Sequence, residues 1–508
     1  MADRGLRVAI VGGGVSGITA AHVLQKQGHQ AVVFEKMNQV GGIWAVSYPQ
    51  VRLQNLRSQY YLSDFPWPFR ADFHPTADQV MRYWSEAIER FGLDVRLGHE
   101  VQRVERGPDA WLVRYRTVNG DHEESFDLLV IASGQFLEKP PPWRIPGQDG
   151  FVGRVMTERD LDDLGDFDGK QVAVVGFGKS ALDVAVLAAQ RASQVWHVFR
   201  TPRWVFPEHL LGVHSSRVVF SRFGSVMVPS WAHPSRPERL LHARLEPVVT
   251  RYWRMVAALF RLQAMSAAWG KGRGARERLR LVLPTHDIRG DFRSAGALAP
   301  MGYFSHVAKG RIQPVHGEIA GFTPTGLLLS GERHVPAELV VLSVGSATPA
   351  FPYLPPEYRT LLEGEPDGVQ LYRHVIHPRI PALAFAGFNH GFMHVPAVEV
   401  GMLWLCAYLR GDLVLPTVEE MERSMQHIQA WKRAHIAFEP SRSCNVNLRF
   451  QQYIDILLAD LGVSPYRKLP NVLAEVFARY GPEDYRGVVG EYERQRQRGR
   501  HSVAAVAT

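Results

Sequence analysis

Two glycine-rich motifs stand far apart in the chain, and each has the spacing that holds the phosphates of a dinucleotide. The first lies in residues 8–36, VAIVGGGVSGITAAHVLQKQGHQAVVFEK, where Gly12, Gly14 and Gly17 form G-x-G-x-x-G. The first glycine permits a tight turn, the second lets backbone approach a pyrophosphate, and the third lets the helix pack on the strand. The free amides at the helix N-terminus would then receive the pyrophosphate.

The residue that ends the following strand indicates which dinucleotide the first motif binds. Glu35 stands there, and a carboxylate accepts hydrogen bonds from ribose hydroxyls but repels a 2′-phosphate. The first motif therefore predicts FAD or NAD. The stretch GGIW follows, in which Gly42 and Ile43 would let backbone approach the ligand while Trp44 walls one side.

The second motif, in residues 171–200, has alanine in place of the third glycine. It consists of Gly176, Gly178, Lys179, Ser180 and Ala181. No acid ends its second strand; Arg200 stands there instead, followed by Thr201. The planar fork of arginine grips phosphate oxygens in two places, which predicts NADPH. Two different dinucleotides imply that hydride passes from a nicotinamide to a flavin.

Strand, helix and strand must position each motif. We expect a strand over residues 8–14, a helix over 15–28 and a strand over 31–35. Residues 76–92 form a predicted amphipathic helix with Thr76 as N-cap and Gly92 as its stop. The apolar run FDLLVIASG predicts a strand buried on both faces. Pro140, Pro141 and Pro142 suggest a crossover between domains.

The predicted fold is α/β, with two Rossmann-like dinucleotide-binding domains and a mostly helical insertion. We assign residues 1–165 and 335–465 to an FAD-binding domain, and 166–207 and 301–334 to an NADPH-binding domain. Residues 208–300 form the insertion, rich in Arg, Trp and His, and 466–508 a C-terminal extension. In the insertion, we expect Trp253, Leu259, Phe260 and Trp269 to line the core or a channel.

Composition excludes several classes of protein. With 46% hydrophobic and 21% charged residues and no apolar run of transmembrane length, the 508-residue chain is an ordinary globular protein. Its two cysteines form no CxxC, and no signal-peptide layout is present, so we expect a cytoplasmic protein. The net charge of +8 has no nucleic-acid motif beside it. We expect no nucleic acid, no membrane partner, and a monomer or homodimer.

One histidine pair has the spacing of four that metal ligands on a helix show. His390 and His394 lie in FNHGFMH, but the intervening glycine and the lack of a nearby carboxylate favour a loop. We therefore expect no metal, and assign these residues, with Asn389, to flavin or substrate contact or to packing.

The order of motifs resembles the class B flavoprotein monooxygenases, which include flavin-containing monooxygenases and Baeyer–Villiger monooxygenases. The stretches that carry the resemblance are the first glycine motif, GGIW, IASGQF, GFGKSA with RTPRWVFP, and GSATPAFPYLP. VPAVEVGMLW resembles the final helix of the family, with Glu399 and Trp404 at matching places. Ser16, Lys36, Val101 and Gly134 complete our assignments to cofactor binding.

The resemblance implies a reaction in which NADPH reduces FAD and the reduced flavin forms a C4a-(hydro)peroxyflavin with O₂. One oxygen atom then passes to a small organic substrate, by N- or S-oxygenation or by Baeyer–Villiger insertion, and positioning and electrostatics supply the catalysis. The family places an Asn before S-D-F-P against flavin and NADP; here Asn55 or Gln54 takes that place. Arg293, or Arg289, is the candidate to hold the peroxide as an anion.

One departure from the family keeps other functions open. The fingerprint F-x-G-x-x-x-H is matched by Phe151 and Gly153, but Thr157 stands where His is expected. An NADPH oxidase or reductase that transfers no oxygen is therefore the alternative. A flavin-bearing interaction protein, using the basic insertion to hold a partner, is a third class.

Overall fold

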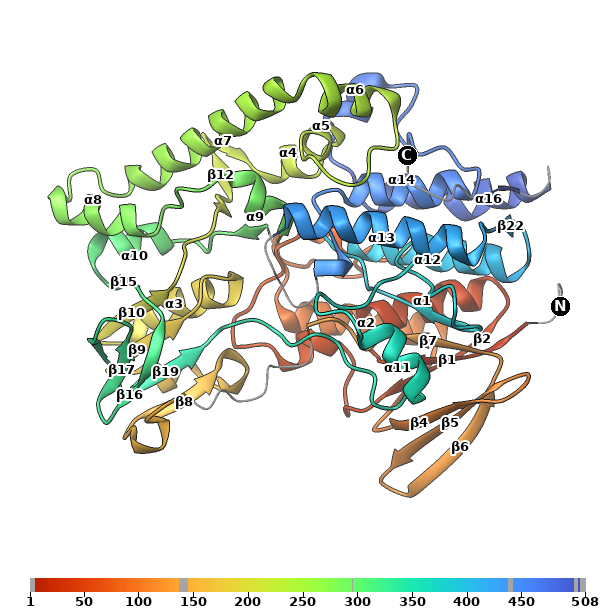
Figure 1. Cartoon of the computed structure of the whole chain (residues 1–508), viewed down its shortest axis with the longest axis horizontal. Coiled ribbons are helices and arrows are strands. Elements are labelled where there is room, and N and C mark those ends of the chain that lie inside the picture. The colour runs from red at the N-terminus through yellow and green to blue at the C-terminus, as the bar shows by residue number, and fades with distance from the viewer. Residues whose placement is uncertain (1–4, 137–144, 295, 437–441, 498–500, 503–508) are drawn as a thin grey trace.

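Two parallel sheets, each of five strands, form the frame of the molecule (Figure 1). The computed structural model describes residues 5–136, 145–294, 296–436, 442–497 and 501–502. The strands of the first sheet lie in the order β20 (Leu383–Phe385), β7 (Leu128–Ile131), β1 (Arg7–Val11), β2 (Gln30–Glu35) and β3 (Asp94–Leu97). Those of the second lie in the order β15 (Ile312–His316), β10 (Gln194–Phe199), β9 (Gln171–Val175), β19 (Leu339–Leu342) and β8 (Arg154–Thr157).

The two sheets repeat one plan. In each, a central strand leads through a glycine turn into a helix, α1 (Val15–Lys26) or α3 (Lys179–Arg191), and the next strand pairs parallel to it. Each also carries an antiparallel three-stranded meander at the same point of the chain order. These are β4 (Glu100–Arg106), β5 (Trp111–Thr117) and β6 (Gly120–Phe126), then β16 (Ile319–Thr323), β17 (Gly326–Leu329) and β18 (Arg333–Pro336). The predicted pair of Rossmann-like units is confirmed.

The sheet membership of two strands differs from the predicted division of the chain. β8 and β19 both belong to the second sheet, where β19 pairs with β9 and β8 pairs with β19. The expected division placed them with the first sheet, inside 1–165 and 335–465. The exact domain boundaries stay a prediction, and strand pairing favours moving these two segments to the second unit. Pro140, Pro141 and Pro142 lie outside the described residues.

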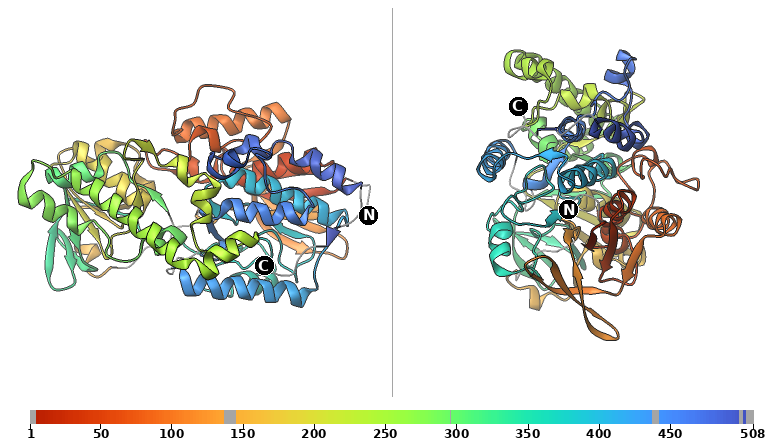
Figure 2. Two further views of the ribbon diagram at one scale, coloured as in Figure 1. Left: turned by 90° about the horizontal axis from the view of Figure 1, so that it is seen from above. Right: turned by 90° about the vertical axis from the view of Figure 1, so that its right-hand side faces the viewer.

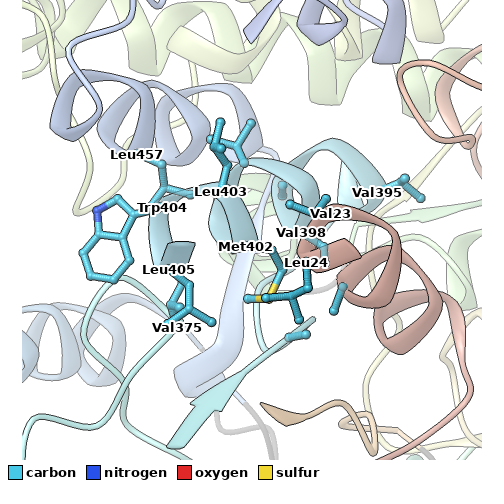
Figure 3. Packing of buried hydrophobic residues seen from close by; sticks show 14 of the residues in the cluster. Val23, Leu24, Val375, Val395, Val398, Met402, Leu403, Trp404, Leu405 and Leu457 are labelled. Atoms are coloured by element: carbon cyan, nitrogen blue, oxygen red, sulfur yellow. The ribbon is translucent and has the colours of Figure 1, made fainter. Parts of the chain in front are cut away.

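Helix α12 (His394–Leu409) is the centre of the largest core cluster, as expected of its apolar sequence (Figure 3). It packs against α1 and against α14 (Phe450–Asp460), so that nearly its whole circumference is buried. Trp404 is fully buried, and its indole nitrogen donates to Asp460 at 3.0 Å. The described residues include no helix that is long and apolar enough to cross a membrane.

Helix α2 (Ala77–Phe91) confirms the predicted start and stop signals. The Thr76 hydroxyl accepts from the Gln79 amide at 3.3 Å, which satisfies one of the unpaired donors of the first turn. Gly92 ends the helix in the left-handed conformation, with φ of +59°.

The insertion is mostly helical, as predicted, and begins with a short hairpin. Its elements are β12 (His209–Leu210), β13 (Val213–His214), α4 (Ser216–Val219), α5 (Arg222–Val226), α6 (Arg236–Arg244), α7 (Glu246–Ser266), α8 (Gly272–Leu281), α9 (Ile288–Ser294) and β14 (Ala297–Leu298). β11 (Val205–Phe206) precedes it and α10 (Tyr303–Lys309) follows it. Helix α7 runs from α6, near the C-terminal helices, to α8, beside the unit of the second sheet (Figures 1 and 2). Its Trp253 and Phe260 are buried as expected, but Trp269, just beyond its end, is 73% exposed.

The remaining elements lie in the C-terminal half. They are α11 (Pro356–Glu363), β21 (His390–Gly391), β22 (Leu413–Val414), α13 (Val418–His435), β23 (Asn445–Asn447), α15 (Val472–Phe477), α16 (Val488–Arg496) and β24 (His501–Ser502).

A buried arginine joins the insertion to the C-terminal helices. The Arg222 guanidinium on α5 donates to Asp455 at 2.5 Å and to Glu475 at 2.7 Å. All three side chains are less than one-tenth exposed. Burial raises the pKa of Asp455 to about 6, despite the neighbouring arginine. Removing one partner of such a group leaves the others charged and desolvated.

We therefore expect Arg222→Ala to lower the free energy of unfolding by about 3–5 kcal/mol, because Asp455 and Glu475 would remain buried without their cation. Denaturant unfolding of the purified protein measures this change. Arg273→Ala is the matched control, since that ion pair with Glu277 is exposed and contributes less than about 0.5 kcal/mol. Equal losses in the two variants would contradict the role assigned to Arg222.

A second buried carboxylate lies on α12. Glu399 accepts from the backbone amide of Ser63 at 3.0 Å and from the Ser63 hydroxyl at 3.0 Å. Burial raises the pKa of Glu399 to about 8. The folded protein therefore holds a proton at Glu399 over a pH range in which the unfolded chain has lost it.

The sign of this shift fixes a pH dependence. Since the folded-state pKa lies above that of the unfolded chain, Glu399 destabilises the fold increasingly as the pH rises from about 4.5 to about 8. Glu399→Gln removes this effect. Relative to the wild type, its free energy of unfolding should rise with pH by up to about 4 kcal/mol. Denaturant unfolding at about pH 5 and about pH 9 measures it, with the exposed Glu89→Gln as control. A difference that stays constant with pH would contradict it.

Candidate functional site

The first glycine turn approaches the neighbouring strand so closely that no side chain fits. Gly12 has φ of +112°, and a Cβ atom there would lie 2.6 Å from the Ala132 carbonyl oxygen. A Cβ at Gly17 would lie 1.9 Å from the Gly12 carbonyl oxygen. The turn and the helix–strand packing thus require glycine at both positions, as the motif predicts.

Gly14 and Gly42 face each other across the mouth of this turn. A Cβ added to Gly42 would lie 3.2 Å from the Gly14 Cα, and the Gly41 amide donates to the Gly13 carbonyl at 3.1 Å. No side chain of the described residues caps the N-terminus of α1. Two bare backbone segments and an uncapped helix start fit the diphosphate of a dinucleotide. GGIW thereby lies against the glycine loop, as expected.

Glu35 is buried at the end of β2, and both of its oxygens accept backbone amides. Oε2 accepts from Gly13 at 2.7 Å and Oε1 from Met37 at 2.8 Å. Each carboxylate oxygen has a further lone pair, so Glu35 can also receive ribose hydroxyls. Lys36 follows at the surface.

The other residues assigned to the first site surround this loop or lie further along the sheet. Ile43 is exposed, whereas the Trp44 indole nitrogen donates to the Tyr60 hydroxyl at 3.3 Å. Gly134 follows β7 with φ of +81°. Val101 lies in the meander, where it pairs with Tyr115.

A histidine that the sequence placed in a loop proves to contact the first glycine motif. The Ser16 hydroxyl lies 2.8 Å from Nε2 of His394, the first residue of α12. Burial lowers the pKa of both His394 and His390 to about 4, so both imidazoles are neutral at pH 7. His390 packs its ring against Phe136 with centroids 4.8 Å apart. Nearby, the buried Asn389 amide oxygen has no hydrogen-bond partner among the described residues, which fits a ligand that supplies a donor.

The second glycine turn repeats the constraint of the first. Gly176 has φ of +122°, and a Cβ there would lie 2.2 Å from the Ser343 carbonyl oxygen. Gly178 starts α3 without a side-chain cap from the described residues and is exposed. Ala181 is fully buried under the turn, as a substitute for the third glycine should be. The turn and its helix again fit a diphosphate.

Lys179 and Ser180 begin α3. The Lys179 ammonium pairs with Asp183 one turn along the same helix, and the Tyr48 hydroxyl donates to Asp183 at 2.7 Å. Tyr48 belongs to the segment that follows GGIW, so this contact joins the two units. Sequence reasoning missed it, because nothing local links Tyr48 to a residue so far along the chain.

Arg200 directly follows β10, one position beyond Phe199, which is the counterpart of Glu35 at the end of β2. Its side chain is 78% exposed, and its guanidinium lies 3.5 Å from the equally exposed carboxylate of Glu318. Thr201 beside it is exposed as well. A cation held so loosely is available to an anionic ligand.

Asn55 and Gln54 lie between the two units and contact different segments. The buried Asn55 amide donates to the carbonyl of Phe392, in the loop before α12. The Gln54 side-chain oxygen accepts from the Leu298 amide of β14 at 2.8 Å. Asn55 therefore belongs with the histidine-bearing loop, and Gln54 with the insertion.

Arg293 contacts other segments than Asn55 and Gln54 do. Its guanidinium donates to the Pro229 carbonyl at 3.2 Å and lies over the Trp431 ring, with 5.7 Å to the centroid. Arg289 pairs with Asp287 at 2.6 Å. Both guanidinium groups are thus engaged in contacts of the insertion.

The fingerprint segment packs between the meander of β16 to β18 and the second sheet. Phe151 packs on Phe322 with ring centroids 5.2 Å apart, and a Cβ at Gly153 would lie 2.3 Å from the Glu338 carbonyl oxygen. Thr157 donates its hydroxyl hydrogen to Asp160 at 2.8 Å. A small residue that closes a short turn thus stands where the family has histidine.

The comparisons with known proteins agree with this geometry. The model of the flavin-binding monooxygenase-like family matches residues 5–233. A probable flavin-containing monooxygenase 1 of Arabidopsis thaliana is 27% identical, covering 96% of this chain and 97% of its own.

Among solved structures, an oxidised steroid monooxygenase bound to NADP is 20% identical with a TM-score of 0.64, over 90% of this chain and 98% of its own. An S-allyl-L-cysteine S-oxygenase from Allium sativum is 18% identical with a TM-score of 0.60, over 98% of this chain and 100% of its own. These two show the fold. The chain thus resembles flavin-binding monooxygenases in sequence over residues 5–233, and it shares the fold of these two solved structures.

Proposed function

We propose that the protein is an FAD-containing, NADPH- and O₂-dependent monooxygenase that transfers one oxygen atom to a small organic substrate. The observation that carries this proposal is the repeated glycine turn. The strand after the first turn ends at buried Glu35, and the strand after the second turn is followed directly by exposed Arg200. One unit then favours a dinucleotide with free ribose hydroxyls, and the other a dinucleotide with a 2′-phosphate.

On the flavin side, the chain's own residues bind and orient. The bare backbone at Gly14 and Gly42 admits the diphosphate, and Glu35 receives the ribose hydroxyls. When bound, the flavin supplies the chemistry, accepting hydride and activating dioxygen. His394 at the start of α12 and His390 just before this helix are both neutral, so neither places a cation beside the first glycine motif.

On the substrate side, the amides of Asn55 and Gln54 are the groups we propose to position nicotinamide and substrate. Asn55 is 7% exposed, so a hydrogen bond from it acts in a site with little competing water. Aromatic residues in and beside the insertion provide apolar surface: Phe260 of the insertion lines one pocket together with Trp204 and Phe304. A small organic substrate of moderate polarity fits such a wall.

The segments around Thr157 and Arg293 leave the type of oxygen transfer to experiment. Arg293 is held by Pro229 and Trp431, and Thr157 closes a turn on Asp160. N- or S-oxygenation and Baeyer–Villiger insertion are therefore both candidates, and an NADPH oxidase is the alternative outcome.

Arg200→Ala tests the nicotinamide side. Losing the charge-assisted hydrogen bonds to the 2′-phosphate should raise KM for NADPH by roughly 10–100-fold and leave KM for NADH unchanged. Steady-state kinetics of flavin reduction with each coenzyme measures this. Arg191→Ala on α3 is the matched control, because its guanidinium pairs with exposed Asp168 and has no assigned coenzyme contact. An unchanged KM for NADPH would remove Arg200 from the site.

The oxygen-transfer reaction is tested by stoichiometry. With a panel of amines, thioethers and ketones, one NADPH and one O₂ should be consumed for each oxygenated product formed. Coupled measurement of NADPH oxidation, product by mass spectrometry and hydrogen peroxide gives the three quantities. Peroxide equal to NADPH with every compound would establish the oxidase and overturn the monooxygenase.

A further inference from the structure

Three side chains from two distant segments converge beside the loop that carries Gln54 and Asn55. One ligand atom each of His74, Glu208 and His214 lies within 4.8 Å of the others. His74 precedes α2, whereas Glu208 and His214 flank the hairpin of β12 and β13. The Ser215 amide donates to the Glu208 carbonyl at 2.8 Å, which closes the hairpin and brings its two ligand residues together.

In each imidazole, Nδ1 contacts a neighbouring group and Nε2 has no hydrogen-bond partner among the described residues. His74 donates from Nδ1 to the Leu53 carbonyl at 3.0 Å. His214 Nδ1 lies 2.7 Å from the Ser216 hydroxyl and accepts from the Ser216 backbone amide at 3.2 Å. Both Nε2 atoms are buried and have no hydrogen-bond partner among the described residues. His74 has the arrangement that metal-binding histidines commonly show, in which one ring nitrogen donates to a second group and the other is free.

Glu208 does not satisfy these nitrogens by itself. Its Oε1 lies 3.9 Å from Nε2 of His214, which is too long for a hydrogen bond. The rings of His74 and His214 stack with centroids 5.9 Å apart.

We propose that His74, Glu208 and His214 form a binding site for a divalent transition metal ion, with Zn²⁺ as the probe. Two imidazole nitrogens and one carboxylate oxygen suit Zn²⁺ and its neighbours, whereas Mg²⁺ and Ca²⁺ prefer an all-oxygen set. Water completes the coordination, because all three residues are only partly buried.

The ion would complete a closed ring of contacts around Gln54. From His74 the ring passes to Leu53, whose amide also donates to the Pro75 carbonyl at 2.8 Å. Gln54 continues it to Leu298 in β14, and β14 pairs with β11 at Phe206. Phe206 lies two residues before Glu208, where the ion closes the ring. The metal would therefore fix the Gln54 loop of the first unit to the start of the insertion.

Metal binding to the flavin-loaded full-length protein tests the proposal. The protein is prepared without a polyhistidine tag, treated with a chelator and titrated with Zn²⁺ in competition with a chromophoric chelator. We expect one Zn²⁺ per chain. His74→Gln and His214→Gln should each weaken binding by roughly 100-fold or more, whereas His122→Gln, exposed on β6, should leave it unchanged.

A thermal melt distinguishes loss of the site from loss of the fold. Zn²⁺ should raise the Tm of the wild type and of His122→Gln but not that of the ligand variants. Glu208→Gln keeps the shape of the side chain and removes only its charge, so it serves where a histidine variant misfolds. Absence of saturable Zn²⁺ binding by the wild type would overturn the proposal, as would equal affinity in His74→Gln, Glu208→Gln and the control.

Discussion

The close approach of two backbones at each glycine turn is the constraint on which the rest of the structure depends. At Gly12 and Gly176, the chain turns with positive φ against a carbonyl oxygen of the neighbouring strand, at distances no side chain tolerates. This contact draws the helix N-terminus to the sheet edge and leaves its first amides uncovered. The strand that follows then brings the residues at its end to the same edge, where we propose that Glu35 and Arg200 distinguish the two coenzymes.

The two units are held together by contacts that lie outside the glycine turns. Tyr48 reaches Asp183 under the second turn, and Gln54 reaches β14 of the insertion. The insertion is fixed in turn to the C-terminal helices through Arg222. These contacts position the segment between GGIW and α2, the segment that also carries Asn55, relative to both turns.

The sequence predicted those features that depend on a few consecutive residues. The glycine spacing, the Thr76 cap and Gly92 stop, and the apolar sequence of α12 each depend on a few consecutive residues, and each prediction is confirmed. Glu35 and Arg200 predicted FAD or NAD at the first motif and NADPH at the second, and the family resemblance narrowed the first to FAD. Periodicity could not show that Trp269 is exposed, because a stripe defines a face of a helix and not what covers it.

The sequence could not predict which strands pair with partners that are distant in the chain. The strands β8 and β19 join the second sheet through partners distant in the chain, and no local pattern encodes that choice. The same holds for His74, whose neighbours Glu208 and His214 are brought to it only by the fold. The resemblance pointed to Arg293, but the contacts of that side chain with Pro229 and Trp431 depend on how the insertion folds back.

Four strands of the first sheet, β1, β2, β3 and β7, have counterparts in β9, β10, β15 and β19 of the second. The Gly12 amide donates to Phe34 as the Gly176 amide donates to Val198, and Gly134 and Gly345 both follow their strands with positive φ. Each half of the molecule can therefore be compared with the other at the positions that we propose to select the coenzyme. If Glu35 and Arg200 set the coenzyme preference as proposed, exchanging the short segments at the ends of β2 and β10 between the halves would exchange that preference as well.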